Sequence, residues 1–199
     1  MNRMILASGN AHKLEEIMEI TKEFGIELVS MSDAGLVDFD IEENGDTFEE
    51  NSMIKAKAVV DKLGEATIAD DSGLMVDYLD GAPGIYSARY SGEDKNYDAN
   101  NKKLLKELSG VPMEKRTARF VSVITLLTPE GRSLVVRGEI EGVISEGEIG
   151  GNGFGYDPLF YIPSKGKTFA ELNSNEKNEI SHRANALIKL KSELKEFLK

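Results

Sequence analysis

The sequence contains no cysteine among its 199 residues. A disulfide framework and a cysteine-ligated zinc site are therefore excluded, and the composition suits a reducing compartment. Histidine is also scarce, because His12 and His182 are the only two in the chain. Two histidines disfavour a histidine-metal site. We expect a cytoplasmic protein. Any metal ion that it binds should be a hard cation with oxygen ligands.

Long apolar runs are missing as well. No run approaches the roughly 18 residues that a membrane span needs, and the segment Met1 to Ala7 is too short for a signal peptide. The 40% hydrophobic content is enough to bury a core as one domain, or as one domain with two lobes. We expect a soluble protein that has no membrane partner and forms a single domain over residues 1–199.

The chain has fewer positively than negatively charged side chains. Its 24 Lys plus Arg against 35 Asp plus Glu leave a net charge of -11. This balance disfavours the attraction to phosphate backbones on which polynucleotide binders rely, so we expect no polynucleotide partner. A small phosphorylated ligand stays open, since a metal ion and a few Lys or Arg residues can overcome an acidic background locally. The alternative is that the charge serves solubility.

Strand-like and helix-like segments alternate along the chain and predict a mixed α/β fold whose strand order is open. The turn-forming segment 128–131, which ends in Gly131, predicts a hairpin between two long β-rich runs. The predicted strands cover residues 3–7, 26–30, 67–69, 74–77, 116–127, 133–145 and 158–162, and the predicted helices cover 11–24, 47–64, 96–108 and 175–198.

Two adjacent carboxylates, Asp70 and Asp71, lie between the short apolar stretches 66–69 and 74–76. An ionised carboxylate near a protein interior needs a cation or several donors, so the pair is a candidate site for a hard divalent metal. The alternative is a polar turn between two strands, since Asp, Ser and Gly all favour turns. These residues alone leave both interpretations open.

A second acidic group begins at Glu42 and Glu43 and continues into the next predicted helix. Thr47 and Glu50 form a Thr-x-x-Glu capping box, while Glu50 and Asn51 are spaced to share the inward face of the helix. With the two aspartates, these acids can complete the oxygen shell of Mg²⁺. A capped helix with a solvated acidic face is the alternative.

The segment Ser8 to Lys13 follows a predicted strand and opens a predicted helix. A helix N-terminus presents unpaired amide donors and a positive dipole end, so this turn can hold a phosphate, with Lys13 as a mobile cation. Ser8 and Asn10 are also ordinary capping residues. A Walker loop is rejected, because the tail Gly166 to Thr168 lacks the required first glycine.

The glycine-rich loop 150–158 contains Phe154, Tyr156 and Asp157. Its aromatic rings can stack on a base or pack into the core, and the Asp157 carboxylate can accept from ring N–H groups. The last predicted helix carries a group of side chains that can offer positive charge and hydrogen-bond donors to a ligand. The alternative is that these side chains form an exposed face of the helix. This group consists of Lys177, His182 and Arg183.

Six segments resemble the signature blocks of the inosine triphosphate pyrophosphatase family, in order and over nearly the whole chain: SGNAHKLEE, EENGDTFEEN, ADDSGL, GAPGIYSARYSGED, GFGYDPLF and SHRA. The resemblance implies an elongated, mixed central sheet flanked by helices, with a cleft between two lobes. It also implies a homodimer, a Mg²⁺ requirement, and cleavage of ITP, dITP and XTP to the monophosphate and pyrophosphate.

Site residues follow from the same motifs. The resemblance implies metal ligands at Glu42 and Asp71, with Asp71 as the presumed base. Ser8 stands where many relatives carry threonine, which keeps the hydroxyl. The implied substrate-binding residues are Ser8, Gly9, Asn10, Ala11, His12, Lys13, Ser72, Phe154, Gly155, Tyr156, Asp157, Lys177, His182 and Arg183.

Cleavage between the α and β phosphates needs an in-line water, a cation on the phosphate oxygens and charge stabilisation on the leaving pyrophosphate. We expect Glu43 or Asp70 to support the ion, and Lys13 and Lys55 to neutralise the leaving group. Which carboxylate takes the proton stays open.

A purine six-carbonyl can accept from His182 or Arg183, whereas the adenine amino group cannot. This argument does not exclude GTP. The rival functions are a pyrophosphatase for modified or pyrimidine triphosphates and a non-catalytic nucleotide sensor. A haloacid-dehalogenase-type phosphatase is the weakest candidate, because Asp70 and Asp71 lack the Asp-x-Asp spacing.

Overall fold

The computed structural model describes residues 3–21 and 25–197. The ends of two predicted helices, at Lys22–Phe24 and at Leu198, lie outside the described residues. Seven strands form one sheet in the order β2-β1-β3-β4-β5-β6-β7. The strands are β1 (Arg3–Ala7), β2 (Glu27–Ser30), β3 (Thr67–Val76), β4 (Thr117–Leu127), β5 (Ser133–Ile144), β6 (Phe160–Ile162) and β7 (Lys167–Thr168).

The sheet is mixed, as the sequence predicted. β1 pairs in parallel with β2 and β3, while β6 pairs antiparallel with β5 and β7. The α-helices are α1 (Ala11–Thr21), α2 (Phe48–Leu63), α3 (Tyr97–Glu107), α4 (Ser174–Ile180) and α5 (His182–Phe197). Short 3₁₀ helices cover Asp77–Leu79, Gly84–Arg89, Met113–Lys115 and Phe169–Glu171. In the described part of the chain, no helix is long and apolar enough to span a membrane.

The chain divides into two compact units. Unit 1 comprises Met1–Asp71, Ser122–Gly138 and Arg183–Lys199, and unit 2 comprises Ser72–Val121 and Glu139–His182. The chain passes from one unit to the other within β3, β4 and β5. The cleft between two lobes that the resemblance implies stays a prediction.

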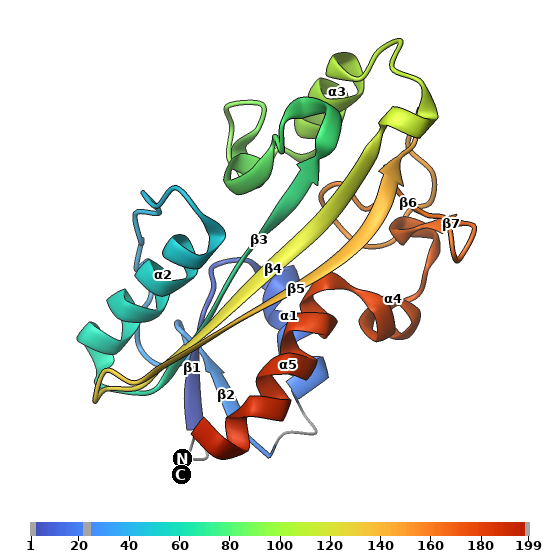
Figure 1. Cartoon of the computed structure of the whole chain (residues 1–199). Coiled ribbons are helices and arrows are strands. Elements are labelled where there is room, and N and C mark those ends of the chain that lie inside the picture. The colour runs from blue at the N-terminus through green and yellow to red at the C-terminus, as the bar shows by residue number, and fades with distance from the viewer. Residues whose placement is uncertain (1–2, 22–24, 198–199) are drawn as a thin grey trace. The chain divides into compact units, whose positions relative to one another are not determined.

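In unit 1, helices cover both faces of the sheet. Figure 1 shows α2 on one face and α1 with α5 on the other. Side chains alternate along β1, so that Ile5 packs in the α2 core, whereas Met4 and Leu6 pack in the core with α1 and α5. The same alternation in β3 directs Ala69 toward α2 and Ile68 toward the opposite face.

The capping box that the sequence predicts at the start of α2 is present. The Thr47 hydroxyl accepts from the Glu50 amide at 3.1 Å, and the Glu50 carboxylate accepts from the Thr47 amide at 3.2 Å. Gly64 ends the helix with a φ of 65°, a left-handed conformation that glycine adopts without strain. Both ends of α2 are therefore determined by local sequence.

Unit 2 has its own apolar core. Leu104 of α3 packs there with aromatic rings from β4, from β6 and from the 3₁₀ helix at 169–171. The Phe120 ring lies 4.7 Å from that of Phe160 and 5.8 Å from that of Phe169, measured between ring centroids. This aromatic cluster supports the segments that carry the predicted base-binding residues.

Two predictions about the elements were wrong. The segments 67–69 and 74–77 are not separate strands, because β3 runs without interruption through the acidic pair. The C-terminal helix is interrupted at Ser181, whose backbone is extended at φ -65° and ψ 157° and which separates α4 from α5. The hairpin between β4 and β5 is confirmed, with the Thr128 amide donating to the Arg132 carbonyl at 2.9 Å.

Candidate active site

The loop after β1 opens α1. The Asn10 side-chain oxygen accepts from the amides of His12 at 3.0 Å and Lys13 at 3.4 Å, and the Asn10 amide donates to the Ser8 hydroxyl at 3.2 Å. Asn10 therefore caps α1, as the capping interpretation predicted. Ser8 is buried and Lys13 half-buried. The other predicted residues of this loop are exposed: Gly9, Ala11 and His12.

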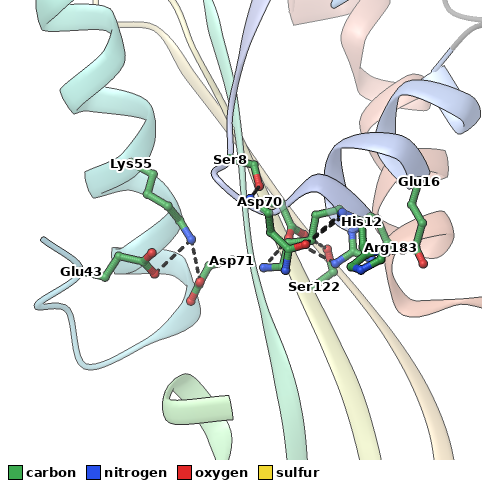
Figure 2. A network of polar contacts seen from close by, with 11 residues as sticks. Ser8, His12, Glu16, Glu43, Lys55, Asp70, Asp71, Ser122 and Arg183 are labelled. Carbon is green, nitrogen blue, oxygen red and sulfur yellow. Dashed lines mark hydrogen bonds and ion pairs between the residues drawn. The ribbon is translucent and has the colours of Figure 1, made fainter. Parts of the chain in front are cut away.

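Asp70 and Asp71 point to opposite faces of the sheet, because they are successive residues of one strand. Figure 2 shows Asp71 directed toward Lys55 of α2 and Asp70 directed toward Arg183, next to α1. The polar-turn interpretation was wrong, and the carboxylates form two separate groups of contacts. Both side chains are buried.

Asp71 shares the ammonium group of Lys55 with Glu43. The Lys55 nitrogen lies 2.7 Å from Asp71 Oδ1 and 3.1 Å from Glu43 Oε2. Asp71 is only 6% exposed, and its second oxygen, Oδ2, has no hydrogen-bond partner among the described residues. A buried carboxylate oxygen that accepts no hydrogen bond is costly. Asp71 Oδ2 is therefore suited to coordinate a cation that enters the site together with a bound ligand.

The electrostatics of this cluster differ between its two acids. Burial raises the pKa of Asp71, and the charges of Lys55 and Lys13 offset this only in part. Burial acts in the same direction on Glu43, but there the Lys55 ammonium prevails and the pKa is lowered. The pKa of Lys55 is raised, because the charges of Asp71 and Glu43 outweigh its own burial. The buried ammonium therefore stays charged.

The acids near the start of α2 differ in exposure. Glu42 is exposed, whereas its neighbour Glu43 reaches Lys55. The expectation that Glu50 faces inward was wrong, because Glu50 is exposed and caps the helix. Asn51 is buried as expected, and its side-chain oxygen accepts from the Gly45 amide at 2.8 Å.

The residues present fit a magnesium ion. The described side chains include no group of three or more His, Cys, Asp or Glu residues able to hold a metal. Mg²⁺, however, is usually bound by one or two carboxylates, and waters and substrate phosphates complete its shell. Asp71, whose Oδ2 has no partner within residues 3–21 and 25–197, and the nearby Glu43 provide such a pair.

Asp70 belongs to a buried network on the other face of β3. Its carboxylate accepts from Ser122 Oγ at 2.5 Å and lies near the charged groups of Lys13 and Arg183. Arg183 is 1% exposed and also contacts the Glu16 carboxylate. The structure thus brings Asp70 to cations of α1 and α5 rather than to Glu43.

Unit 2 holds the aromatic loop, which is organised by Asp157. Asp157 Oδ2 accepts from the Phe154 amide at 2.9 Å and from the Lys177 ammonium at 2.7 Å. That ammonium also lies 4.9 Å from the centre of the Phe154 ring. A Cβ at Gly153, where φ is 74°, would come within 2.0 Å of the same carboxylate oxygen, so only glycine fits there.

The two aromatic residues of the loop differ in burial. Tyr156 is buried, and its hydroxyl donates to the Ser87 carbonyl at 2.9 Å, as the core-packing interpretation predicted. Phe154 is half-buried, with the Tyr97 ring centroid 6.1 Å away, and Gly155 is likewise half-buried. Phe154 is therefore the ring of this pair that keeps exposed surface.

The basic group near the C-terminus is buried, so the exposed-face interpretation was wrong. Lys177 bonds Asp157, and His182 stacks on Phe120 with ring centroids 4.9 Å apart and an angle of 14° between the planes. Arg183, the next residue, belongs to unit 1 with Asp70. Ser72 is half-buried and directly follows Asp71 along β3.

Ser122 and Glu16 were missed by sequence reasoning. Ser122 is a fully buried polar residue in the apolar run of β4, which was a readable signal. Glu16 lies three residues after Lys13 on α1, a spacing that places both on one face of the helix. Their partners, Asp70 for Ser122 and Arg183 for Glu16, lie far away in the sequence.

The fold and the two clusters define a mixed α/β protein with a buried, charged site typical of an enzyme. The chain belongs to the Ham1 family, whose model matches residues 4–193. The predicted family resemblance is thereby confirmed.

Individual relatives match over the full length. A dITP/XTP pyrophosphatase of Clostridium perfringens is 53% identical, with 100% of both chains covered. The Staphylococcus aureus Ham1 protein superposes with a TM-score of 0.87 at 43% identity, covering 97% of this chain and 98% of that one. A HAM1 protein from Coxiella burnetii gives 0.88 at 40% identity, with 98% and 100% covered.

Proposed function

We propose that this protein hydrolyses the non-canonical purine nucleoside triphosphates ITP, dITP and XTP between the α and β phosphates, releasing the monophosphate and pyrophosphate. One observation carries the proposal: Asp71 is a buried carboxylate with one oxygen bonded to Lys55 and the other without a partner in the described part of the chain. The name dITP/XTP pyrophosphatase, borne by a relative 53% identical over the whole chain, supports this choice of substrate. We further propose that the protein acts in the cytoplasm as a homodimer.

Asp71 is proposed as the residue that accepts the proton of the attacking water. Burial raises the pKa of Asp71, which makes it a stronger base than an exposed aspartate. Lys55 and Lys13 are proposed to neutralise charge on the departing pyrophosphate. A bound Mg²⁺, held by Asp71 and by Glu43 or Glu42, would supply Lewis-acid polarisation of the phosphate oxygens.

The loop at residues 8–13 is proposed to take part of the triphosphate. Asn10 already satisfies the amides of His12 and Lys13, so the Lys13 ammonium is the main charge that this loop offers. Ser8 and Ser72 are proposed to contribute hydroxyl groups.

Unit 2 is proposed to bind the purine. Phe154, half-buried and next to the Lys177 ammonium, offers a ring face for stacking. Because Asp157 bonds the Phe154 amide and Lys177, its role is first to hold the loop. We retain His182 or Arg183 as the hydrogen-bond donor to the carbonyl at position six of the purine. Adenine has an amino group there, so this donor would stay unpaired and ATP binding would be weaker by about 1 to 3 kcal/mol.

The test is a panel of ITP, dITP, XTP, GTP, ATP and dUTP with Mg²⁺, in which pyrophosphate and orthophosphate are measured separately. We expect pyrophosphate from the first three substrates. Orthophosphate alone would place cleavage at another bond, preference for dUTP would favour the rival pyrophosphatase, and binding without product would favour the sensor.

Variants connect the panel to the site. Asp71→Asn should fold and lose at least about 100-fold in kcat, as removal of a general base does. The matched control is Asp61→Asn, since Asp61 also pairs with a lysine of α2, Lys57 at 2.7 Å, but both are exposed. Near-normal turnover in folded Asp71→Asn would remove Asp71 from the mechanism.

A further inference from the structure

Asp70 is an acid whose two oxygens are both engaged away from the metal candidates. Ser122 Oγ donates to Oδ1 at 2.5 Å, while Oδ2 lies 2.9 Å from the Lys13 ammonium and 3.3 Å from an Arg183 nitrogen. The Asp70 side chain has no exposed surface. Burial alone would raise the pKa of Asp70, but the Arg183 and Lys13 charges hold it well below the ordinary value.

Of the two cations in this network, Lys13 is the one that reaches solvent, because Arg183 is almost fully buried. It lies in the first turn of α1, and its side chain is 15% exposed. A lysine side chain is long and flexible, and its ammonium carries three donors. The bond to Asp70 uses one donor and sets the position of the nitrogen, so that two donors are left for other acceptors. The Lys13 charge also acts on Asp71 and Glu43, on the other face of β3.

The network is balanced in charge. Lys13, Asp70, Arg183 and Glu16 alternate in sign along a chain of contacts that Figure 2 shows in part. Arg183 retains a carboxylate partner in Glu16 when Asp70 is neutralised, whereas Lys13 contacts Asp70 through the single ion pair at 2.9 Å. Loss of the Asp70 charge therefore affects the position of Lys13 more than that of Arg183.

We propose that Asp70 is a positioning residue, which fixes the Lys13 ammonium at the point where it meets the leaving phosphates. This rests on the proposed function. Asp70 acts through Lys13 and neither ligates the ion nor takes the proton. Charge on the leaving pyrophosphate grows toward the transition state, so a displaced ammonium costs catalysis more than binding.

The first test is Asp70→Asn in the full-length protein, assayed with ITP and Mg²⁺. The amide keeps the shape and an acceptor for Ser122 but removes the anion. We expect kcat to fall roughly 100-fold, the loss that a misplacement of about 1 Å can cause, while KM changes by less than about threefold. A rise in KM with unchanged kcat overturns the proposal.

The second test is a double-mutant cycle with Lys13→Met. If Asp70 acts through Lys13, then adding Asp70→Asn to Lys13→Met lowers kcat no further than Lys13→Met alone. A merely structural role for Asp70 gives the same loss in both backgrounds. Additive losses therefore overturn the proposal.

Two more variants cover a failure of Asp70→Asn to fold. Asp70→Glu keeps an anion at this point and should retain most of kcat. Ser122→Ala removes the hydrogen bond to Oδ1, leaves both charges, and should lower kcat roughly tenfold, the value of a hydrogen bond to a charged group. Wild-type kcat in folded Ser122→Ala overturns the proposal.

The matched control is Asp77→Asn in unit 2. Asp77 also accepts from a hydroxyl, Thr117 at 2.6 Å, and from an arginine, Arg119 at 3.0 Å, but it is exposed. Its substitution should leave kcat unchanged. If wild-type protein releases no pyrophosphate from ITP, the proposed function fails; if it does and Asp70→Asn matches it, the positioning role alone fails.

Discussion

At the scale of single residues, Asp70 and Asp71 show how environment separates two identical side chains. The pKa of Asp70 is lowered, because the nearby Arg183 and Lys13 outweigh its burial, while that of Asp71 is raised, because burial outweighs Lys55. At neutral pH the first is therefore ionised and can hold the Lys13 ammonium in place. The second is the better base, and opposite shifts in neighbouring acids are typical of divided roles.

The acids at the start of α2 lead to a prediction at the same scale. We expect Glu43→Gln to lower kcat/KM at least about tenfold, because Glu43 shares the Lys55 ammonium with Asp71. Steady-state kinetics with ITP at several Mg²⁺ concentrations measure this loss and any shift in metal demand. Glu42→Gln is the paired variant, since Glu42 is exposed. A larger loss for Glu42→Gln would restore Glu42 as the principal ligand.

The sequence indicated which acids matter but not their partners. Asp70 and Asp71 were identified because carboxylates in an apolar run are costly. The partner of Asp71 lies 16 residues away in the chain, whereas the partners of Asp70, which are Lys13, Ser122 and Arg183, all lie at least 52 residues away. Such contacts depend on the strand order, which local patterns do not contain.

At the scale of elements, the caps of α2 connect stability to the site, because α2 carries Lys55. We predict that Thr47→Ala lowers the free energy of unfolding by about 1 kcal/mol, the usual value of an N-cap hydroxyl. Urea denaturation measures this, with the exposed Ser133 as the control in Ser133→Ala. If the free energies of unfolding of the two variants differ by less than about 0.3 kcal/mol, the capping box makes no measurable contribution to stability.

The loop at residues 153–157 provides a prediction on pH. Burial, with the charges of Tyr90 and Glu107, raises the pKa of Tyr156 above its ordinary 10.0. A group whose pKa is higher in the folded protein than in the unfolded chain contributes stability that is complete below the unfolded-state pKa. This stability is lost as the pH rises from there through the folded-state pKa. Wild-type protein should therefore lose stability above pH 10 through this group, at up to about 1.4 kcal/mol per pH unit.

Tyr156→Phe tests this contribution by urea denaturation between about pH 8 and about pH 11. At the lower pH the variant should be about 1 kcal/mol less stable, since it lacks the hydrogen bond to the Ser87 carbonyl. The difference should shrink or reverse at the higher pH. A constant difference across the range would mean that Tyr156 ionises equally easily in folded and unfolded protein.

Elements with local signals were predictable, and elements determined by distant contacts were not. The Thr47 capping box and Gly64 define α2 within the sequence itself. β3 was predicted as two pieces, because its polar centre resembles a turn until Lys13, Lys55 and Arg183 are seen to compensate the charges. The interruption at Ser181 had no local breaker such as glycine or proline to reveal it.

At the scale of the whole molecule, the shared strands determine how the two units depend on each other. β3 contributes Ile68 to a core of unit 1 and Leu74 to the core of unit 2. β4 does the same with Ile124 and Phe120. Unfolding of either core therefore releases strands on which the other core depends.

We predict from this that residues 1–199 unfold as one cooperative domain, although they contain two compact units. Leu6→Ala in unit 1 should cost about 2 to 5 kcal/mol and Phe160→Ala in unit 2 about 3 to 5 kcal/mol, since both side chains are fully buried. Calorimetry of each variant should show a single transition at a lower temperature, with equal calorimetric and van't Hoff enthalpies.

Ile188→Ala is the control, because Ile188 lies on α5 with 58% of its surface exposed and should leave the transition in place. If the units were independent, Leu6→Ala would split the transition and leave a second component at the wild-type temperature. Phe160→Ala would also split the transition, and the component at the wild-type temperature would then come from unit 1. A single shifted peak in both variants indicates that the shared strands transmit the loss of one core to the other, because β3, β4 and β5 each carry side chains of both cores.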